Sequence, residues 1–113
     1  MDIKKHITTL GFVPKNGTND IYHKTYVDYA IEIDFKKQNI NYGNSIIAES
    51  RTTQNFSQPE NFVVLECVDR LLIKGYKPQN IVLEKTWPSG HGTSGRLDIC
   101  VNREDGTPYM LIE

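Results

Sequence analysis

The end of the sequence constrains the fold most strongly. Two apolar β runs, residues 95–101 and 107–113, flank a polar segment, residues 102–106, that ends in Asp105-Gly106. An Asp-Gly pair between alternating apolar residues is one of the strongest local signals for a β-hairpin. The sequence therefore predicts two antiparallel strands joined by a tight turn.

This hairpin carries an acidic residue on each strand. Asp98 and Glu113 each lie about seven residues from the turn, so antiparallel pairing brings them close to opposite one another. Two facing carboxylates repel each other unless a positive charge lies between them, and hard oxygen ligands suit Mg²⁺. The hairpin therefore points to a divalent cation held by Asp98 and Glu113.

The first half of the chain predicts a short helix followed by an antiparallel β meander. A helix over residues 2–11 places Ile3, Ile7 and Leu10 on one face and ends at Gly11. Strict alternation predicts one strand from residue 21 to 35 with one buried face and one hydrated face. The residues expected on the buried face are Val27, Tyr29, Ile31, Ile33 and Phe35. Shorter strands are expected over residues 40–42 and 46–48, as part of the same meander.

A second helix is predicted from Pro59-Glu60 to about Lys74, with Gly75 as its stop. At about 100° per residue, its apolar side carries Val64, Cys67, Val68, Leu71 and Leu72, and its polar side carries Glu66, Asp69, Arg70 and Lys74. Glu60 falls on the apolar side, where an acid needs an explanation. It either forms a capping box with Ser57 or supports a metal site on the hairpin, and the two interpretations are compatible.

The hairpin also carries a family resemblance. Gly-Arg-x-Asp-Ile, a turn and then Pro-Tyr-x-Leu-Ile-Glu resemble the PD-(D/E)xK nuclease motif of the N-terminal domain of type I restriction-enzyme R subunits and related restriction-modification proteins. The resemblance extends back through the predicted helix and residues 74–81, and so covers about the second half of the chain. In that family the Asp and the Glu bind the catalytic metal, and a Lys two residues after the Glu helps to activate the attacking water.

The resemblance implies an α/β fold with a restriction-endonuclease-like mixed sheet flanked by helices, preceded by the β meander. Residues 1–113 then form a single domain, with the helix and meander in residues 1–56 and a nuclease-like core, truncated at its C-terminal end, in residues 57–113. Asp98 and Glu113 are the implied catalytic and Mg²⁺-binding residues, with Glu60 in support. No nucleotide is expected in this domain.

The motif's lysine would follow Glu113, where the sequence stops. Without that lysine, we expect the fragment itself to be weak or inactive. A chain that ends on a β run also suggests an excised domain. The implied partners are double-stranded DNA within a larger complex and other restriction-modification subunits or domains. Arg96 could meet a DNA phosphate, and its alternative is an ordinary strand-edge residue.

Composition limits these interpretations. The chain has 113 residues, 38% hydrophobic and 24% charged, with a net charge of −1, which fits one ordinary globular domain. Near-neutral charge argues against strong DNA affinity by this piece alone, because such affinity comes mostly from clustered Lys and Arg. No apolar run is long enough to span a bilayer and no signal-peptide core follows Met1, so we expect a cytoplasmic protein without a membrane partner.

The remaining candidates favour unspecialised roles. Glu32 and Asp34 are expected on the hydrated face of a strand, and the two cysteines are expected to be small buried hydrophobes. The glycine-rich loop over residues 88–95 lacks the Gly-Lys-Ser/Thr of a Walker loop. Three functional hypotheses remain open: a metal-dependent DNA endonuclease domain, a noncatalytic docking or DNA-positioning module fused to a DNA methyltransferase or another restriction-modification subunit, and an unrelated α/β domain.

Overall fold

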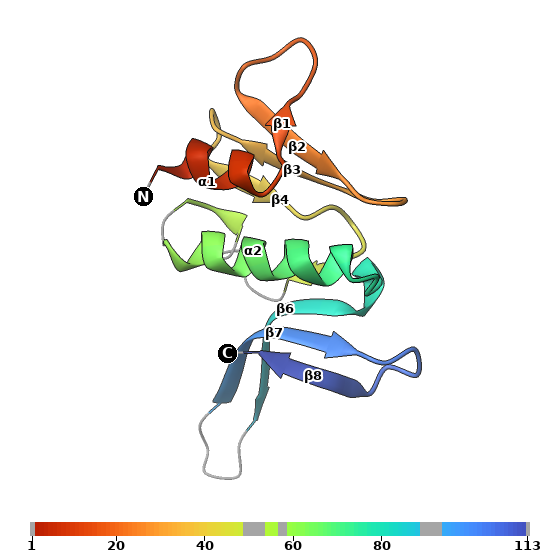
Figure 1. Cartoon of the computed structure of the whole chain (residues 1–113). Coiled ribbons are helices and arrows are strands. Elements are labelled where there is room, and N and C mark those ends of the chain that lie inside the picture. The colour runs from red at the N-terminus through yellow and green to blue at the C-terminus, as the bar shows by residue number, and fades with distance from the viewer. Residues whose placement is uncertain (1, 49–53, 57–58, 89–93, 113) are drawn as a thin grey trace.

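The protein is a mixed α/β structure in which one helix lies between two β-sheets (Figure 1). The computed structural model describes residues 2–48, 54–56, 59–88 and 94–112. For residues 84–88, 94–98, 108 and 111 it describes the backbone alone. One continuous apolar cluster joins residues from both sheets and from the helix between them. None of the described helices is long and apolar enough to cross a membrane.

The first sheet is antiparallel and contains β1 (Val13–Pro14), β2 (Ile21–Thr25), β3 (Ala30–Asp34) and β4 (Asn39–Asn41), in that order. The helix α1 (Ile3–Thr9) precedes it, and Ile7 joins the shared core. The predicted meander therefore forms.

The prediction of one strand over residues 21–35 is wrong. The chain reverses between β2 and β3, where the Tyr26 amide donates a hydrogen bond to the Tyr29 carbonyl at 2.7 Å. Val27 lies in this reversal and is fully exposed, whereas Ile31 and Ile33 are buried as expected. An uninterrupted strand of that length would extend about 50 Å, so the reversal lets its two halves pair with each other.

The second sheet has the order β5 (Ile47–Ala48), β6 (Ile81–Pro88), β7 (Ser94–Asn102) and β8 (Pro108–Ile112). The strand predicted over residues 46–48 was assigned to the meander, and that assignment is wrong. As β5 it pairs in parallel with β6, Ile47 opposite Val82. Parallel neighbours need a long crossover, and the helix between β5 and β6 provides it.

That crossover helix is α2 (Glu60–Ile73), which confirms the second predicted helix. Its buried residues are Asn61, Phe62, Val64, Leu65, Val68, Asp69, Leu71 and Leu72. With half-buried Cys67 they cover an arc of about 220° at 100° per residue. A helix packed on one partner buries a narrower stripe. The wide arc follows from the sheet that covers each side of α2 (Figure 1).

Both helices end at the glycines that the sequence predicts. Gly11 and Gly75 have φ angles of 104° and 99°, in the left-handed region that glycine adopts without a side-chain clash. In each case the residue after the glycine donates its amide to a carbonyl five residues earlier, Phe12 to Ile7 and Tyr76 to Leu71. A short 3₁₀ helix, η2 (Pro78–Asn80), then leads from α2 into β6.

Candidate functional site

The predicted C-terminal hairpin is present as β7 and β8. The two strands are antiparallel, with Ile99 opposite Ile112 and Val101 opposite Met110, and the register shifts between Val101 and Asn102. In the turn, the Arg103 amide donates to the Thr107 carbonyl at 2.7 Å, and the Asp105 carboxylate accepts a hydrogen bond from the Thr107 amide at 2.9 Å. The Thr107 hydroxyl also donates to this carboxylate at 2.6 Å, and the two hydrogen bonds, the hydroxyl one foremost, hold the pKa of the Asp105 carboxyl below its usual value.

Asp98 lies in β7, the strand with β6 on one side and β8 on the other. Its neighbours in the chain are Leu97, which pairs with Lys85, and Ile99, which pairs with Leu83 and Ile112. Ile99 is buried in the core beneath α2. The Asp98 backbone is therefore fixed by pairing on a packed strand, which is the kind of rigid support that a catalytic carboxylate needs.

The other hairpin candidates extend past the described part of the structure. Ile112 is the last described residue, so Glu113 lies outside it. Arg96 of β7 pairs with Thr86 of β6. The side chains of Arg96 and Asp98 are not among those that the structure describes. Most of the glycine-rich loop, residues 89–93, also lies outside the described residues. The final described pair, Ile99 with Ile112, has the register that the predicted pairing of Asp98 with Glu113 requires.

Glu60 does not occupy the position that its helical angle predicts. It is the first residue of α2 and is exposed, although it lies in line with buried Val64 and Leu71. The residue before it, Pro59, caps the helix without a side-chain hydrogen bond, and Ser57 of the predicted capping box lies outside the described residues. An ionised carboxylate keeps its hydration at the end of a helix, where it also interacts favourably with the helix dipole.

Among the side chains that the structure describes, which do not include those of Glu84 and Asp98, no three His, Cys, Asp or Glu residues group closely enough to hold a metal ion. Neither cysteine forms a disulfide, and Cys100 is buried while Cys67 is half-buried on α2. Glu32 forms an ion pair with Lys15, and Asp34 accepts hydrogen bonds from the amides of Lys36 and Lys37 at 2.9 and 3.0 Å. These two acids are thus satisfied by local partners.

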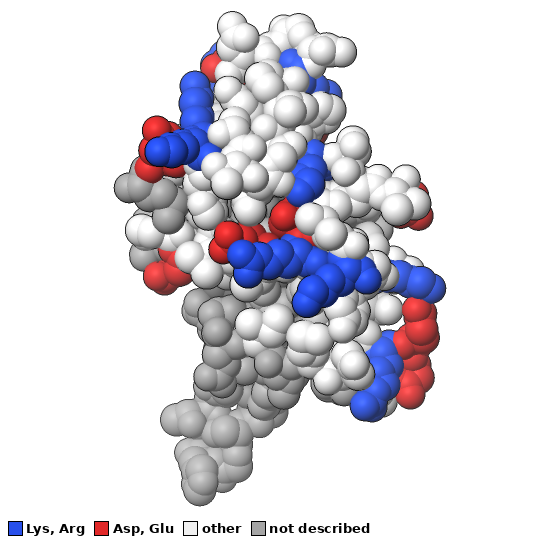
Figure 2. Space-filling view, in the orientation of Figure 1, with Lys and Arg blue, Asp and Glu red and all other residues white. Residues whose placement is uncertain are grey.

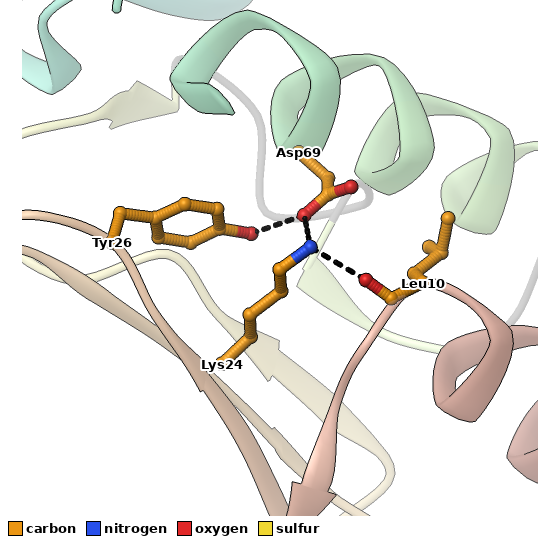
Figure 3. A network of polar contacts seen from close by, with 4 residues as sticks. All are labelled: Leu10, Lys24, Tyr26 and Asp69. Atoms are coloured by element: carbon orange, nitrogen blue, oxygen red, sulfur yellow. Dashed lines mark hydrogen bonds and ion pairs between the residues drawn. The ribbon is translucent and has the colours of Figure 1, made fainter. Parts of the chain in front are cut away.

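The structure also reveals a buried polar network that the sequence did not predict (Figure 3). The Lys24 ammonium lies 2.6 Å from the Asp69 carboxylate and donates to the Leu10 carbonyl at 2.5 Å. The Tyr26 hydroxyl donates to the same Asp69 oxygen at 2.7 Å. The Asp69 side chain is only 4% exposed, so its prediction as part of the polar side of α2 is wrong.

Asp69 is buried because α2 has a second covered side. Phe62, Leu65 and Leu72, at helical spacings from Asp69, are buried in the same way, and Asp69 itself meets Lys24 of the first sheet. The corresponding signal on β2 is that Lys24 alternates with Tyr22 and Tyr26, both of which pack on the core. An inward lysine and an acid among large apolar residues of a helix could have been matched as a buried pair.

The network joins three parts of the chain: β2 with Tyr26 just after it, the residue that follows α1, and α2. The drawn hydrogen bonds of Lys24 and Tyr26 all end on protein acceptors from α1 and α2 (Figure 3). Burial and the bond to Asp69 raise the pKa of the Tyr26 hydroxyl well above its usual value of 10. The tyrosine stays neutral at physiological pH and acts as a donor, so the network fits a structural role.

No protein-family model, no curated protein and no solved structure matches this chain. The functional argument therefore comes from the residues and from their arrangement.

Proposed function

We propose that this chain is the N-terminal endonuclease-like domain of a type I restriction-modification protein, with a restriction-endonuclease-like fold. In the intact protein it would take part in metal-dependent hydrolysis of DNA phosphodiester bonds. The observation that carries the proposal is the order α2, β6, β7 and β8, with Asp98 on the central strand of that antiparallel trio. A helix followed by a hairpin that bears an Asp and then a Glu is the arrangement that the resemblance implies.

The proposed metal ligands suit the proposed ion. Mg²⁺ prefers hard oxygen donors such as carboxylates. If the pairing of Ile99 with Ile112 continues by one residue, Asp98 lies opposite Glu113. When bound, Mg²⁺ would polarise the scissile phosphate and lower the pKa of a bound water. The role of the chain's own residues is to position the two carboxylates on paired strands. Glu60, exposed at the start of α2, stays a secondary candidate for supporting them.

A second candidate function is a noncatalytic module that docks to, or positions DNA for, a methyltransferase or another restriction-modification subunit. The net charge of −1 favours it, because a domain that captures DNA alone is usually basic. Both candidates share the fold and differ in whether Asp98 takes part in chemistry.

Plasmid cleavage by the intact polypeptide tests the proposal. We expect Mg²⁺-dependent cleavage that falls by at least about a hundredfold in Asp98→Asn, since this change removes a ligand charge and keeps the shape of the side chain. Asp28→Asn is the matched control, because Asp28 is an exposed acid in the β2–β3 reversal. Cleavage that survives Asp98→Asn contradicts the assignment. Association with a methyltransferase partner, without cleavage, decides for the module.

A calorimetric titration of the 113-residue chain separates metal binding from catalysis. We expect marginal binding of Mg²⁺ or Mn²⁺ that is lost in Asp98→Asn and in Glu113→Gln. Tight binding that neither substitution changes would show that the metal site lies elsewhere.

A further inference from the structure

The C-terminal end of α2 and the β7–β8 hairpin together form a surface that the proposed nuclease site does not use. We name it the α2–β8 surface, and it consists of Arg70, Lys74, Tyr76, Lys77, Arg103 and Tyr109. On the face displayed in Figure 2, positive side chains follow one another across the middle of the molecule, at the level of α2 in Figure 1. The chain as a whole is near neutral, so this concentration of cations is local.

The cations of this surface are open to solvent. The side chains of Arg70 and Lys77 are 70% and 57% exposed, and Lys74 and Arg103 are also exposed. Arg70 and Lys74 are one helical turn apart and therefore project from the same side of α2. Arg103 lies in the β7–β8 turn. Lys77 contacts the same turn, because its ammonium forms an ion pair with the Glu104 carboxylate at 2.9 Å. Two separate elements thus contribute to one positive surface.

Aromatic rings lie among these cations. Tyr109 is 55% exposed, and its ring centroid is 6.4 Å from that of Tyr76. The Arg103 guanidinium lies over the Tyr109 ring at 5.5 Å. A half-exposed tyrosine with a stacked guanidinium is a platform on which a planar base can stack.

The surface is also hollowed. A depression of about 200 Å³ lies between α2 and β8, lined by Arg70, Lys74 and Tyr76 above the apolar side chains of Leu71 and Met110. A shallower one of about 430 Å³ adjoins Lys74, Gly75 and Tyr76. Tyr76 lines both depressions. The cations therefore border a concave region next to an aromatic ring.

Neighbouring acids weaken this surface only partly. Arg70 meets Glu66 at 3.5 Å, a long contact near the surface, where water and salt screen an ion pair and leave it weak. Among the described side chains, Lys74 and Arg103 form no ion pair within 4.0 Å, although the Asp105 carboxylate in the same turn interacts electrostatically with Arg103. Phosphate can compete for Arg70 and Lys77, because each guanidinium or ammonium has further N–H donors.

We propose that the α2–β8 surface binds single-stranded nucleic acid, with the four cations on phosphates and Tyr109 stacked on a base. Positive charge alone would suit any polyanion, whereas alternation of cations with a half-exposed aromatic ring suits a strand whose bases are unpaired. The inference concerns binding and requires no metal, so it is independent of the proposed cleavage chemistry.

Fluorescence anisotropy of a labelled oligothymidine of about 20 nucleotides tests this proposal, with EDTA present to remove divalent metal. For four phosphate contacts to a single strand, log K should fall against log salt with a slope of about −2.8. In Lys74→Glu/Arg103→Glu we expect at least about tenfold weaker binding and a slope nearer −1.4. The control Lys5→Glu/Lys36→Glu makes the same charge change at exposed lysines on α1 and after β3, and should bind within about twofold of wild type.

A second variant tests the aromatic ring. Tyr109→Leu keeps an apolar side chain on β8 and removes the stacking face, so it should weaken oligothymidine binding about fivefold to 150-fold and leave duplex binding unchanged. Tyr109→Trp keeps an aromatic face and should bind oligothymidine about as tightly as wild type. A purely structural role of Tyr109 in β8 would not predict this difference between the Leu and Trp variants. Equal losses in the charge-change variant and its control would overturn the proposal. So would equally tight binding of a glutamate-rich peptide, because that result would indicate a general polyanion surface.

These outcomes are separable from those of the nuclease proposal. Loss of cleavage in Asp98→Asn with unchanged oligothymidine binding concerns the hairpin site alone. Absence of oligothymidine binding in a chain whose intact form cleaves DNA refutes the α2–β8 surface alone.

Discussion

The two sides of α2 are packed in different ways. Toward the first sheet, Phe62 begins a series of edge-to-face aromatic contacts through Phe56 and Phe35 to Tyr22, with ring centroids 5.1 to 5.5 Å apart. Asp69 adds the buried ion pair on this side. Toward the second sheet, the partners in the core are the aliphatic residues Ile81, Leu83, Ile99 and Val101.

This difference separates two kinds of stabilisation. Aliphatic packing is non-directional and depends mainly on apolar area, so it tolerates small changes of position. A buried ion pair stabilises only when both partners and their hydrogen bonds are in place. We therefore expect the Lys24–Asp69 pair to contribute mainly specificity, by linking β2 and the end of α1 to α2, and the second sheet to contribute mainly hydrophobic stability.

The largest expected effect comes from breaking the ion pair. Asp69→Ala leaves the Lys24 ammonium, 17% exposed, without its carboxylate and should lower the free energy of unfolding by about 3–5 kcal/mol. Urea denaturation measures the change. The double variant Lys24→Met/Asp69→Leu should recover most of the loss, because no unpaired charge remains. A double variant as unstable as Asp69→Ala would show that the pair contributes more than specificity.

Matched core truncations test whether the apolar contributions of the two sheets are similar. Ile33 in β3 and Leu83 in β6 are both completely buried in the shared core. Ile33→Ala and Leu83→Ala should each cost about 2–5 kcal/mol, from lost transfer free energy and the cavity left behind. If only one of the two variants is strongly destabilised in urea, the two sheets do not contribute alike.

Alkaline pH should affect the first-sheet side selectively. Burial raises the pKa values of Tyr26 and Tyr42 above the value of 10 that each has in the unfolded chain. The unfolded state then loses these protons first, so stability is complete below pH 10 and falls as the pH rises above it. Well above pH 10, each tyrosine lowers the free energy of unfolding by about 1.4 kcal/mol per pH unit, and at pH 10 by about half as much per unit. Tyr26→Phe should remove one of these two contributions, and urea denaturation at a series of pH values above 10 measures the difference. An unchanged slope would contradict the buried, neutral Tyr26.

The smallest effect should be a gain in stability. The Tyr42 side chain is buried, and its hydroxyl has no hydrogen-bond partner among the described residues. Tyr42→Phe removes this unsatisfied group and should raise the free energy of unfolding by about 1 kcal/mol. A thermal shift of a few degrees upward is expected. A downward shift would indicate that the hydroxyl has a partner in solution, such as an ordered water.

Local signals located most of the secondary structure. The glycines after α1 and α2 ended both helices where the sequence predicts, because a left-handed residue follows a helix at lowest cost when it has no side chain. The Asp105-Gly106 turn produced the predicted hairpin. These features depend on a few neighbouring residues and can therefore be predicted without tertiary information.

The predictions that failed depended on which segments pair or pack with one another. The strand over residues 21–35 became a hairpin because its halves pair with each other, and β5 left the meander because α2 carries the chain back to form a parallel neighbour. Periodicity describes which residues share a face and does not say which element covers it. The proposed roles of Asp98, Glu113, Arg96 and Glu60 stay predictions, although Glu60 proved exposed.

The sequence by itself determined the positions of α1, α2 and the C-terminal hairpin, since turn chemistry and apolar spacing act over a few residues. Only the tertiary structure decided that α2 is covered on both sides, which turned Asp69 from a predicted surface acid into the partner of Lys24. The physical reason is desolvation: a carboxylate can be buried only where a cation from another element reaches it, and that meeting depends on the packing of the whole chain.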